Sequence, residues 1–178
     1  MKKRDSFLRI KLSFLLLLVS IVIGCGYTFA PQGKHIDRRI KNIYVEPFGN
    51  KTAQAEIENF MRTAFIDQII QNSRFKAVPN IEQADAIISG NILNLNTHAL
   101  SYRKSILAAE ERMTVILETT FREKDGGKIL WSSRNVIATV DYELRDDMNS
   151  MPADKKRALA KLSRDTAEKA FNLMMANF

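Results

Sequence analysis

The chain's single cysteine, Cys25, is the residue whose position points most directly to chemistry. Five basic residues precede an apolar run over residues 13–23; they are Lys2, Lys3, Arg4, Arg9 and Lys11. This charged-then-apolar order is typical of a secretory signal peptide. Because Cys25 stands where such a signal would end, we expect its thiol to be a site of covalent modification.

The residues around Cys25 resemble a bacterial lipobox, with Val22 three positions before the cysteine and Gly24 directly before it. Leucine is more usual at the position of Val22. The resemblance implies that residues 1–24 are a lipoprotein signal peptide. It also implies that Cys25 becomes the first mature residue and carries a diacylglycerol and an N-acyl chain such as palmitate.

An uncleaved membrane anchor is the alternative, because residues 12–33 form an uncharged stretch of 22 residues and a spanning helix needs about 17–25. However, Gly24, Gly26 and Pro31 interrupt its second half, and the dense apolar part has 11 residues, within the roughly 7–15 of a signal core. The cleaved signal is therefore favoured. Both interpretations place the rest of the chain outside the cytoplasm.

The charge balance changes once the signal is removed. The whole chain has 27 Lys plus Arg and 20 Asp plus Glu, but residues 1–24 hold five basic and one acidic residue. The remaining 154 residues carry a net charge of +3, which does not indicate a nucleic-acid binder. They suffice for one domain with a single core. With Cys25 acylated, no disulfide is expected.

Residues suited to catalysis or metal binding are few. Neither His35 nor His98 accompanies a motif that resembles an activated nucleophile. No His, Asp and Glu residues have metal-ligand spacing, and the acidic pair at 146–147 is typical of a solvated surface. Residues 125–128 are too short for a phosphate-binding loop. We therefore expect no enzymatic activity, no metal and no cofactor beyond the acyl chains on Cys25.

The remaining sequence predicts a tether over residues 25–39 and a single domain over residues 40–178. Residues 40–48 alternate as a strand does, and the period then changes to that of a helix over residues 52–72. The apolar stripe of this helix contains Ile57, Phe60, Met61, Ala64, Phe65 and Ile69. Strands are predicted at 74–78 and 84–96, where Gly90 suggests a bulge or a close backbone approach.

The second half predicts a hairpin followed by a helix. Residues 112–122 alternate as a strand, residues 125–128 form a glycine-containing turn, and residues 129–144 form the partner strand. After Pro152, an apolar stripe at Leu159, Leu162, Thr166, Ala170 and Leu173 predicts a helix. Residues 97–110 show no clear period, and His98 is interpreted as a loop residue. We expect an α+β two-layer sandwich, with two helices packed on one face of a mostly antiparallel four- to five-stranded sheet.

Four segments together resemble the lipopolysaccharide-assembly lipoprotein family LptE. They are residues 25–29 (CGYTF), 43–52 (IYVEPFGNKT), 84–90 (ADAIISG) and 127–131 (GKILW). Their order and spacing cover nearly all of the chain after the signal.

The resemblance implies a non-enzymatic protein at the inner leaflet of the outer membrane of a Gram-negative bacterium, anchored by lipid on the periplasmic side. Proteins of this family plug the lumen of the β-barrel LptD, help it to assemble and assist lipopolysaccharide through it. Gly26 agrees with outer-membrane sorting, because lipoproteins retained in the inner membrane typically carry Asp there. A lipid-anchored adaptor of another secretion or transport complex is the alternative; a lipid-anchored hydrolase has little support.

Lipopolysaccharide carries phosphates, so Lys and Arg near an exposed tip are its natural ligands. The first candidates are Arg103 and Lys104, in the segment between two predicted strands; Arg112, Arg122 and Lys128, near hairpin ends, come second. The family's own binding residues do not transfer by motif. The sequence therefore predicts a lipid-anchored partner of a β-barrel and of lipopolysaccharide, with no nucleic-acid partner.

Overall fold

A computed structural model describes residues 36–37, 39–72, 74–102, 108–145 and 149–176. All of them belong to one compact unit, Gln32–Phe178. The predicted signal, Cys25 and most of the tether lie outside the described residues, as do Arg103 and Lys104. Among the described residues, no helix has the length and apolar character needed to span a membrane.

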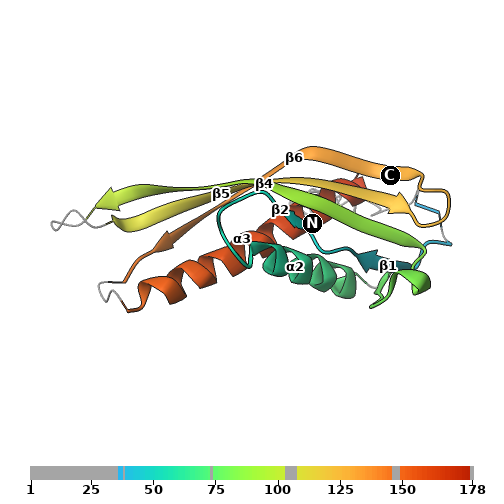
Figure 1. The fold of residues 1–178 in the computed structure, drawn as a ribbon, viewed down its shortest axis with the longest axis horizontal. Coiled ribbons are helices and arrows are strands. Elements are labelled where there is room, and N and C mark those ends of the chain that lie inside the picture. Colours follow the sequence, from blue (N-terminus) through green and yellow to red (C-terminus); the bar gives the residue numbers. More distant parts are fainter. Residues whose placement is uncertain (1–35, 38, 73, 103–107, 146–148, 177–178) are drawn as a thin grey trace, which may run out of the picture. The chain divides into compact units, whose positions relative to one another are not determined.

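The domain is a six-stranded sheet with two helices on one of its faces (Figure 1). In chain order, its elements are β1 (Asn42–Val45), β2 (Gly49–Asn50), α2 (Ile57–Gln71), β3 (Lys76–Ala77), a 3₁₀ turn (Ile81–Gln83), β4 (Ala86–Tyr102), β5 (Ala108–Glu123), β6 (Ile129–Glu143) and α3 (Met151–Ala176). The predicted α+β class with two helices on one face is confirmed.

The sheet is mixed, and it has six strands where the sequence predicts four or five. The strand order is β3-β1-β4-β5-β6, with β2 also paired to β4. The short pairings of β1 with β3, β1 with β4 and β2 with β4 are parallel, and the long pairings of β5 with β4 and β6 are antiparallel. Helix α2 connects β2 to β3 and returns the chain to the same end of the sheet, so the flanking strands run parallel.

Both helices bury most of the apolar stripe that the sequence predicts. Ile57, Met61, Phe65 and Ile69 of α2 are fully buried and join the core formed with α3 and the sheet. On α3, Leu159, Leu162, Thr166 and Ala170 are buried, but Leu173 is 39% exposed. The assignment of Leu173 to the buried stripe is therefore wrong, because the last turns of α3 keep one side open to solvent.

Three features of the sequence have clear local causes. Gly126 and Gly127 both have positive φ and close the β5–β6 turn, where the Glu123 N–H donates to the Lys128 carbonyl at 2.9 Å. Gly90 marks a close approach, because an added Cβ would lie 2.2 Å from the Glu118 carbonyl oxygen. The Asp85 carboxylate accepts the N–H groups of Lys41 and Asn42 at 2.9 and 2.8 Å, tying the start of β1 to β4.

The strands β4 and β5 extend further than their side-chain pattern indicates. They pair from Ala86 opposite Glu123 to Tyr102 opposite Ala108, so His98 lies in a strand and not in a loop. Two register shifts occur between Ala99 and Tyr102. The described parts of residues 97–112, which we call the hairpin tip, are mostly exposed. A strand that is exposed on both faces has no reason to alternate, so periodicity does not reveal it.

Candidate functional site

The basic residues predicted from the sequence fall at two separate ends of the sheet. Arg112 lies on β5 at the base of the hairpin tip, whereas Arg122 lies ten residues further along the same strand, a separation of roughly 33 Å at ~3.3 Å per residue. Lys128 follows the β5–β6 turn at that far end. Of these three residues, Arg112 is the one near the tip, so they do not form one site.

The guanidinium of Arg112 is already engaged. Its Nε and Nη2 atoms both donate to the carboxylate of Asp141 on β6, at 2.7 Å each. This side-chain hydrogen bond raises the pKa of Arg112 and lowers the pKa of Asp141. Arg122 is likewise paired, with its Nη2 3.2 Å from Glu46 Oε1. Neither arginine is therefore an isolated cation.

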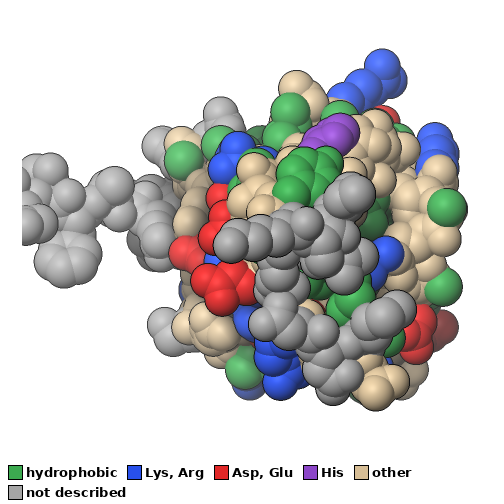
Figure 2. All heavy atoms as spheres, turned by 90° about the vertical axis from the view of Figure 1, so that its left-hand side faces the viewer, with side chains coloured by type: hydrophobic (Ala, Val, Ile, Leu, Met, Phe, Trp, Pro, Cys, Tyr) green, Lys and Arg blue, Asp and Glu red, His purple; other side chains and the backbone are tan. Residues whose placement is uncertain are grey.

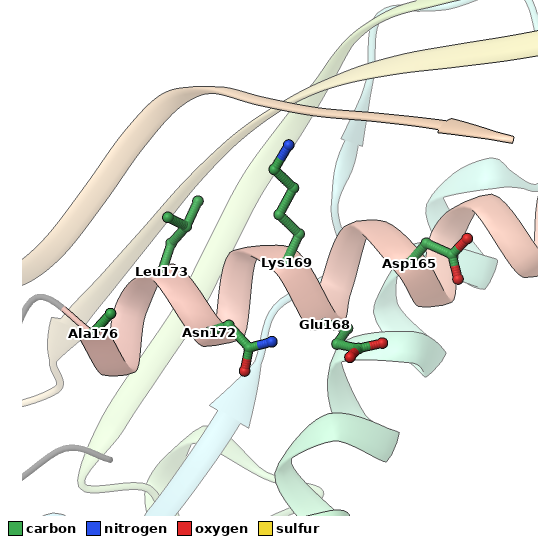
Figure 3. Close-up of a pocket in the computed structure, with 6 residues that line it drawn as sticks. All are labelled: Asp165, Glu168, Lys169, Asn172, Leu173 and Ala176. Carbon is green, nitrogen blue, oxygen red and sulfur yellow. The ribbon is translucent and has the colours of Figure 1, made fainter. Parts of the chain in front are cut away.

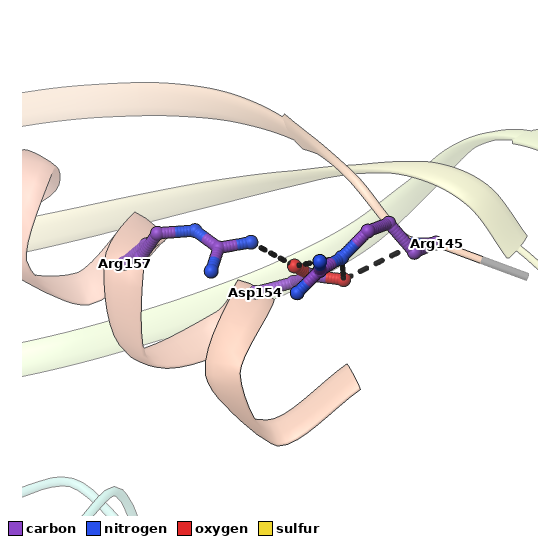
Figure 4. Close-up of polar contacts among 3 residues, drawn as sticks. All are labelled: Arg145, Asp154 and Arg157. Carbon is purple, nitrogen blue, oxygen red and sulfur yellow. Dashed lines mark hydrogen bonds and ion pairs between the residues drawn. The ribbon is translucent and has the colours of Figure 1, made fainter. Parts of the chain in front are cut away.

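Sequence reasoning missed a cluster of two arginines centred on Asp154 in the first turn of α3 (Figure 4). The carboxylate of Asp154 is only 2% exposed, yet it accepts the backbone N–H and the Nε–H of Arg145, at 3.1 Å each, and a hydrogen bond from Arg157. The backbone hydrogen bond from Arg145 is the main cause that lowers the pKa of Asp154. One buried carboxylate thus fixes two guanidiniums that are themselves more than half exposed.

This arginine cluster (Arg145, Asp154 and Arg157) lies beside the base of the hairpin tip, because the neighbouring Leu144 N–H donates to the Ala109 carbonyl of β5 at 2.9 Å. Two guanidiniums on one carboxylate retain a net positive charge and unused N–H donors, which suits a phosphate or another anion. The Asp154–Arg157 spacing of three residues is a signal that the sequence carries. The Arg145 contact spans nine residues and has no such signal.

Charges at this end of the domain are mixed (Figure 2). Basic, acidic and hydrophobic side chains are interspersed on the visible face, without a large area of one sign. Leu100 and Tyr102 of the hairpin tip are 43% and 68% exposed, so the tip also presents apolar surface. The end face therefore combines cationic groups with hydrophobic ones, as binding of an amphipathic anion requires.

The sheet face that points away from the helices is a second candidate surface. Its residues make polar cross-strand contacts: Thr114 with Thr139 at 3.2 Å, Arg134 with Glu118 at 3.5 Å, and Asn91 with Glu118 at 3.2 Å. No described helix covers this face (Figure 1). It is a polar surface interrupted by Ile137, which is 38% exposed.

The described residues offer no candidate metal site. They contain no cluster of three or more His, Cys, Asp or Glu side chains placed to hold a metal ion. His98 stands on β4, opposite Arg112 in the register.

Comparison with known proteins gives one family. The model of the family LptE, described as lipopolysaccharide-assembly, matches residues 40–176, which include all the described strands and both helices. No curated protein matches the chain.

Several solved structures resemble this fold at low sequence identity. An uncharacterized lipoprotein B from Nitrosomonas europaea is 16% identical over 78% of this chain and 84% of that one, with a TM-score of 0.52. The rare lipoprotein B from Shewanella oneidensis is 12% identical over 77% and 96%, with a TM-score of 0.50. A PelC dodecamer from Paraburkholderia phytofirmans is 14% identical over 82% and 94%, also with a TM-score of 0.50. These likenesses show a shared fold.

Proposed function

Because the chain belongs to the lipopolysaccharide-assembly family LptE, we propose that it plugs an LptD-like β-barrel of the outer membrane, helps that barrel to assemble and assists lipopolysaccharide through it. The family match over residues 40–176 is the observation that carries this proposal. It extends over all the described strands and both helices and not over one motif. The role is structural and transport-related, without a catalysed reaction.

The proposed anchor is the acylated Cys25, on the periplasmic side of the outer membrane. The lipobox-like residues before Cys25 support it, and so does the description of two proteins of similar fold as lipoproteins. Mass spectrometry of the mature protein tests this directly. We expect a diacylglycerol and an N-acyl chain on Cys25, and we expect Cys25→Ala to remove both and release the protein from membranes.

The outward sheet face suits the lumen of a barrel. Lumens of porin-sized barrels are lined with polar side chains, and the outward face offers threonines and charge pairs that are already satisfied within the sheet. Where these pairs lie, the surface can pack against a polar wall without leaving a buried charge unpaired. The buried apolar core lies on the other side, so docking does not require the domain to unfold.

For the glycolipid, we propose a site at the hairpin-tip end. Arg103 and Lys104 stand between β4 and β5 in the chain, and Arg112 and the arginine cluster lie near the described part of β5 that follows them. Phosphate groups favour the paired N–H donors of arginine. Arg122 and Lys128 occupy the opposite end of β5 and stand as a separate, weaker prediction.

The decisive experiment is purification of the tagged full-length chain from the envelope in detergent. We expect an LptD-like barrel protein to co-purify, and depletion of the chain to leave that barrel misassembled. Recovery of an inner-membrane transporter in place of a barrel would support the adaptor alternative. A barrel that assembles and functions normally without this chain would sink the proposal.

The glycolipid site is tested by binding of diphosphoryl lipid A to the full-length chain in nonionic detergent. Replacing Arg103 and Lys104 with Gln should weaken binding about tenfold, since hydrogen bonds to charged groups are worth ~1.5–3 kcal/mol. The matched control replaces Lys41 and Lys76, which lie at the β1–β3 edge, and should bind normally. Unchanged affinity of the Arg103 and Lys104 variant at low salt, where electrostatic attraction is strongest, would remove these residues from the site.

A further inference from the structure

Strand β6 is a long edge strand. Among the described strands it pairs with β5 alone, over 15 residues from Ile129 to Glu143. On the opposite side of the sheet the outermost strand, β3, has two residues, and β4 pairs with described strands on that side only as far as Ile92. An edge strand presents unpaired N–H and C=O groups that can accept another strand, and proteins usually keep such edges short or cover them. A 15-residue edge therefore stands out as a surface for strand addition.

Two contacts identify which backbone N–H and C=O groups of β6 point away from β5, toward the open edge of the sheet. The Leu144 N–H donates to the Ala109 carbonyl, so Leu144 points toward β5. In an antiparallel pair this direction alternates from residue to residue, and the register is unbroken from Val136 to Glu143. The N–H and C=O groups that point away from β5 therefore belong to Ile137, Thr139, Asp141 and Glu143. In agreement, Lys169 Nζ of α3 donates to the Ile137 carbonyl at 2.7 Å from outside the sheet, a hydrogen bond that an added strand would displace.

A hollow of ≈ 450 Å³ lies along α3, lined by Asp165, Glu168, Lys169, Asn172, Leu173 and Ala176 (Figure 3). Lys169 and Leu173 project from α3 on the side where β6 runs. A strand added beside β6 would direct every second side chain toward this side, because side chains alternate between the two faces of a sheet. The exposed Leu173 would then gain an apolar neighbour.

The charges along the edge specify what the added strand should carry. Glu143 lies directly opposite Glu110, and both are exposed. Like charges at opposite positions are destabilising. Asp141, two residues earlier, is neutralised by Arg112. A Lys or Arg beside Glu143 would therefore be stabilising, while Ile137 and Thr139 favour β-branched neighbours.

We propose that the open edge of β6, from Ile137 to Glu143, pairs with an extended segment of the barrel protein. This segment carries β-branched residues beside Ile137 and Thr139 and a Lys or Arg beside Glu143. This inference rests on the proposed function, because a barrel under assembly supplies unpaired strands. Backbone hydrogen bonds provide the attraction and the charge next to Glu143 selects the register.

The first test removes one backbone N–H donor on the open edge of β6, that of Thr139. Thr139→Pro deletes an N–H that points away from β5, so the β5–β6 ladder keeps its hydrogen bonds, and proline is tolerated at such edge positions. Thr139→Ala is the matched control, since both variants lose the hydroxyl contact with Thr114. We expect Thr139→Pro in the full-length chain to reduce the co-purified barrel about tenfold relative to Thr139→Ala, through the lost hydrogen bond and the steric block.

A second test does not depend on proline being accommodated. Glu143→Lys relieves the repulsion from Glu110, so the variant should melt at a higher temperature than the parent chain, yet it should recover less barrel because it repels the partner's cation. Glu143→Gln is its control and should show a smaller change in recovery. A purely structural role would shift stability and recovery in the same direction.

The outcomes separate this inference from the proposed function. If the parent chain recovers no barrel, the proposed function fails. If the parent chain recovers barrel and both Thr139→Pro and Glu143→Lys recover it as well as their controls do, the strand-addition site is overturned while the function stands. A parent chain that self-associates in a way that Thr139→Pro abolishes, with unchanged barrel recovery, would likewise overturn the inference by making a second copy the occupant.

Discussion

Successive residues of β5 face two different environments. Met113, Val115, Leu117 and Phe121 point toward the helices and are fully buried. The alternate residues Arg112, Thr114 and Glu118 point away and make their contacts across the outward face. The same strand therefore supplies the core with one set of side chains and a partner surface with the other. Stability should depend on the helix-facing set, and binding on the outward set.

The largest expected effect comes from the helix-facing side. Phe121→Ala removes a fully buried ring and should lower the free energy of unfolding by about 3–5 kcal/mol, as cavity-forming substitutions of aromatic residues do. Denaturant titration followed by circular dichroism measures this loss. Thr120→Ala, on the adjacent outward-facing residue, is the control and should stay within about 1 kcal/mol of the parent chain. Equal losses would contradict the division between the two faces.

Gly90→Ala should give the next largest effect. Gly90 is on the helix-facing side of β4, where an added Cβ would lie 2.2 Å from the Glu118 carbonyl oxygen and 2.9 Å from the Phe48 ring. Overpacking of this kind costs about 1–3 kcal/mol, measured by the same titration. The neighbouring Ser89→Ala points the other way and should change little. A Gly90→Ala variant as stable as the parent chain would show that β4 and β5 can separate at this point without cost.

A third prediction concerns Asp154, the one charged side chain among the described residues that is buried. Its lowered pKa means that its contribution to stability is present above the pKa of an unfolded carboxyl group and is lost as the pH falls through its folded pKa. Asp154→Asn should therefore lower the melting temperature at pH 7, and the difference from the parent chain should shrink below about pH 4.

Thermal melts from pH 7 to pH 3 test this prediction, with Asp67→Asn on the exposed side of α2 as the control for the loss of a charge. A difference between parent and Asp154→Asn that stays constant across this range would show that the carboxylate's charge does not stabilise the fold.

The smallest expected effect is on the outward face. Thr114→Ala removes the 3.2 Å hydroxyl contact with Thr139, and such cross-strand pairs are worth about 0.2–1 kcal/mol. The denaturation midpoint should hardly move. A loss comparable to that of Gly90→Ala would mean that the outward face also determines stability, and the two faces would no longer have separate tasks.

Features encoded locally could be predicted from the sequence. The stripe that includes Ile57, Met61 and Phe65, the alternation of residues 112–122 and the glycine turn at 126–127 each depend on neighbours within a few residues. They led to the correct α+β class with both helices on one face. The family resemblance was equally accessible, because it depends on the order of short motifs, and the match over residues 40–176 confirms it.

Features that depend on distant parts of the chain were not predictable. The parallel pairing of β1 with β4 joins residues more than forty positions apart, and no local pattern encodes strand direction. The exposed end of β4 around His98 lacks alternation because neither face is buried there. Leu173 fits a helical stripe, but whether a stripe position is covered depends on what packs beside it.

The candidate sites divide in the same way. By itself the sequence determined the family, and it supplied the predictions of acylation at Cys25 and of basic ligands between β4 and β5. Tertiary structure decided that Arg112 is paired with Asp141, that Arg122 and Lys128 lie at the other end of the sheet, that Arg145 meets Arg157 on one buried carboxylate, and that β6 has an open edge. The physical reason is that side-chain pairing and strand edges depend on which segments meet in space, whereas period and motif depend on residues that are close in the chain.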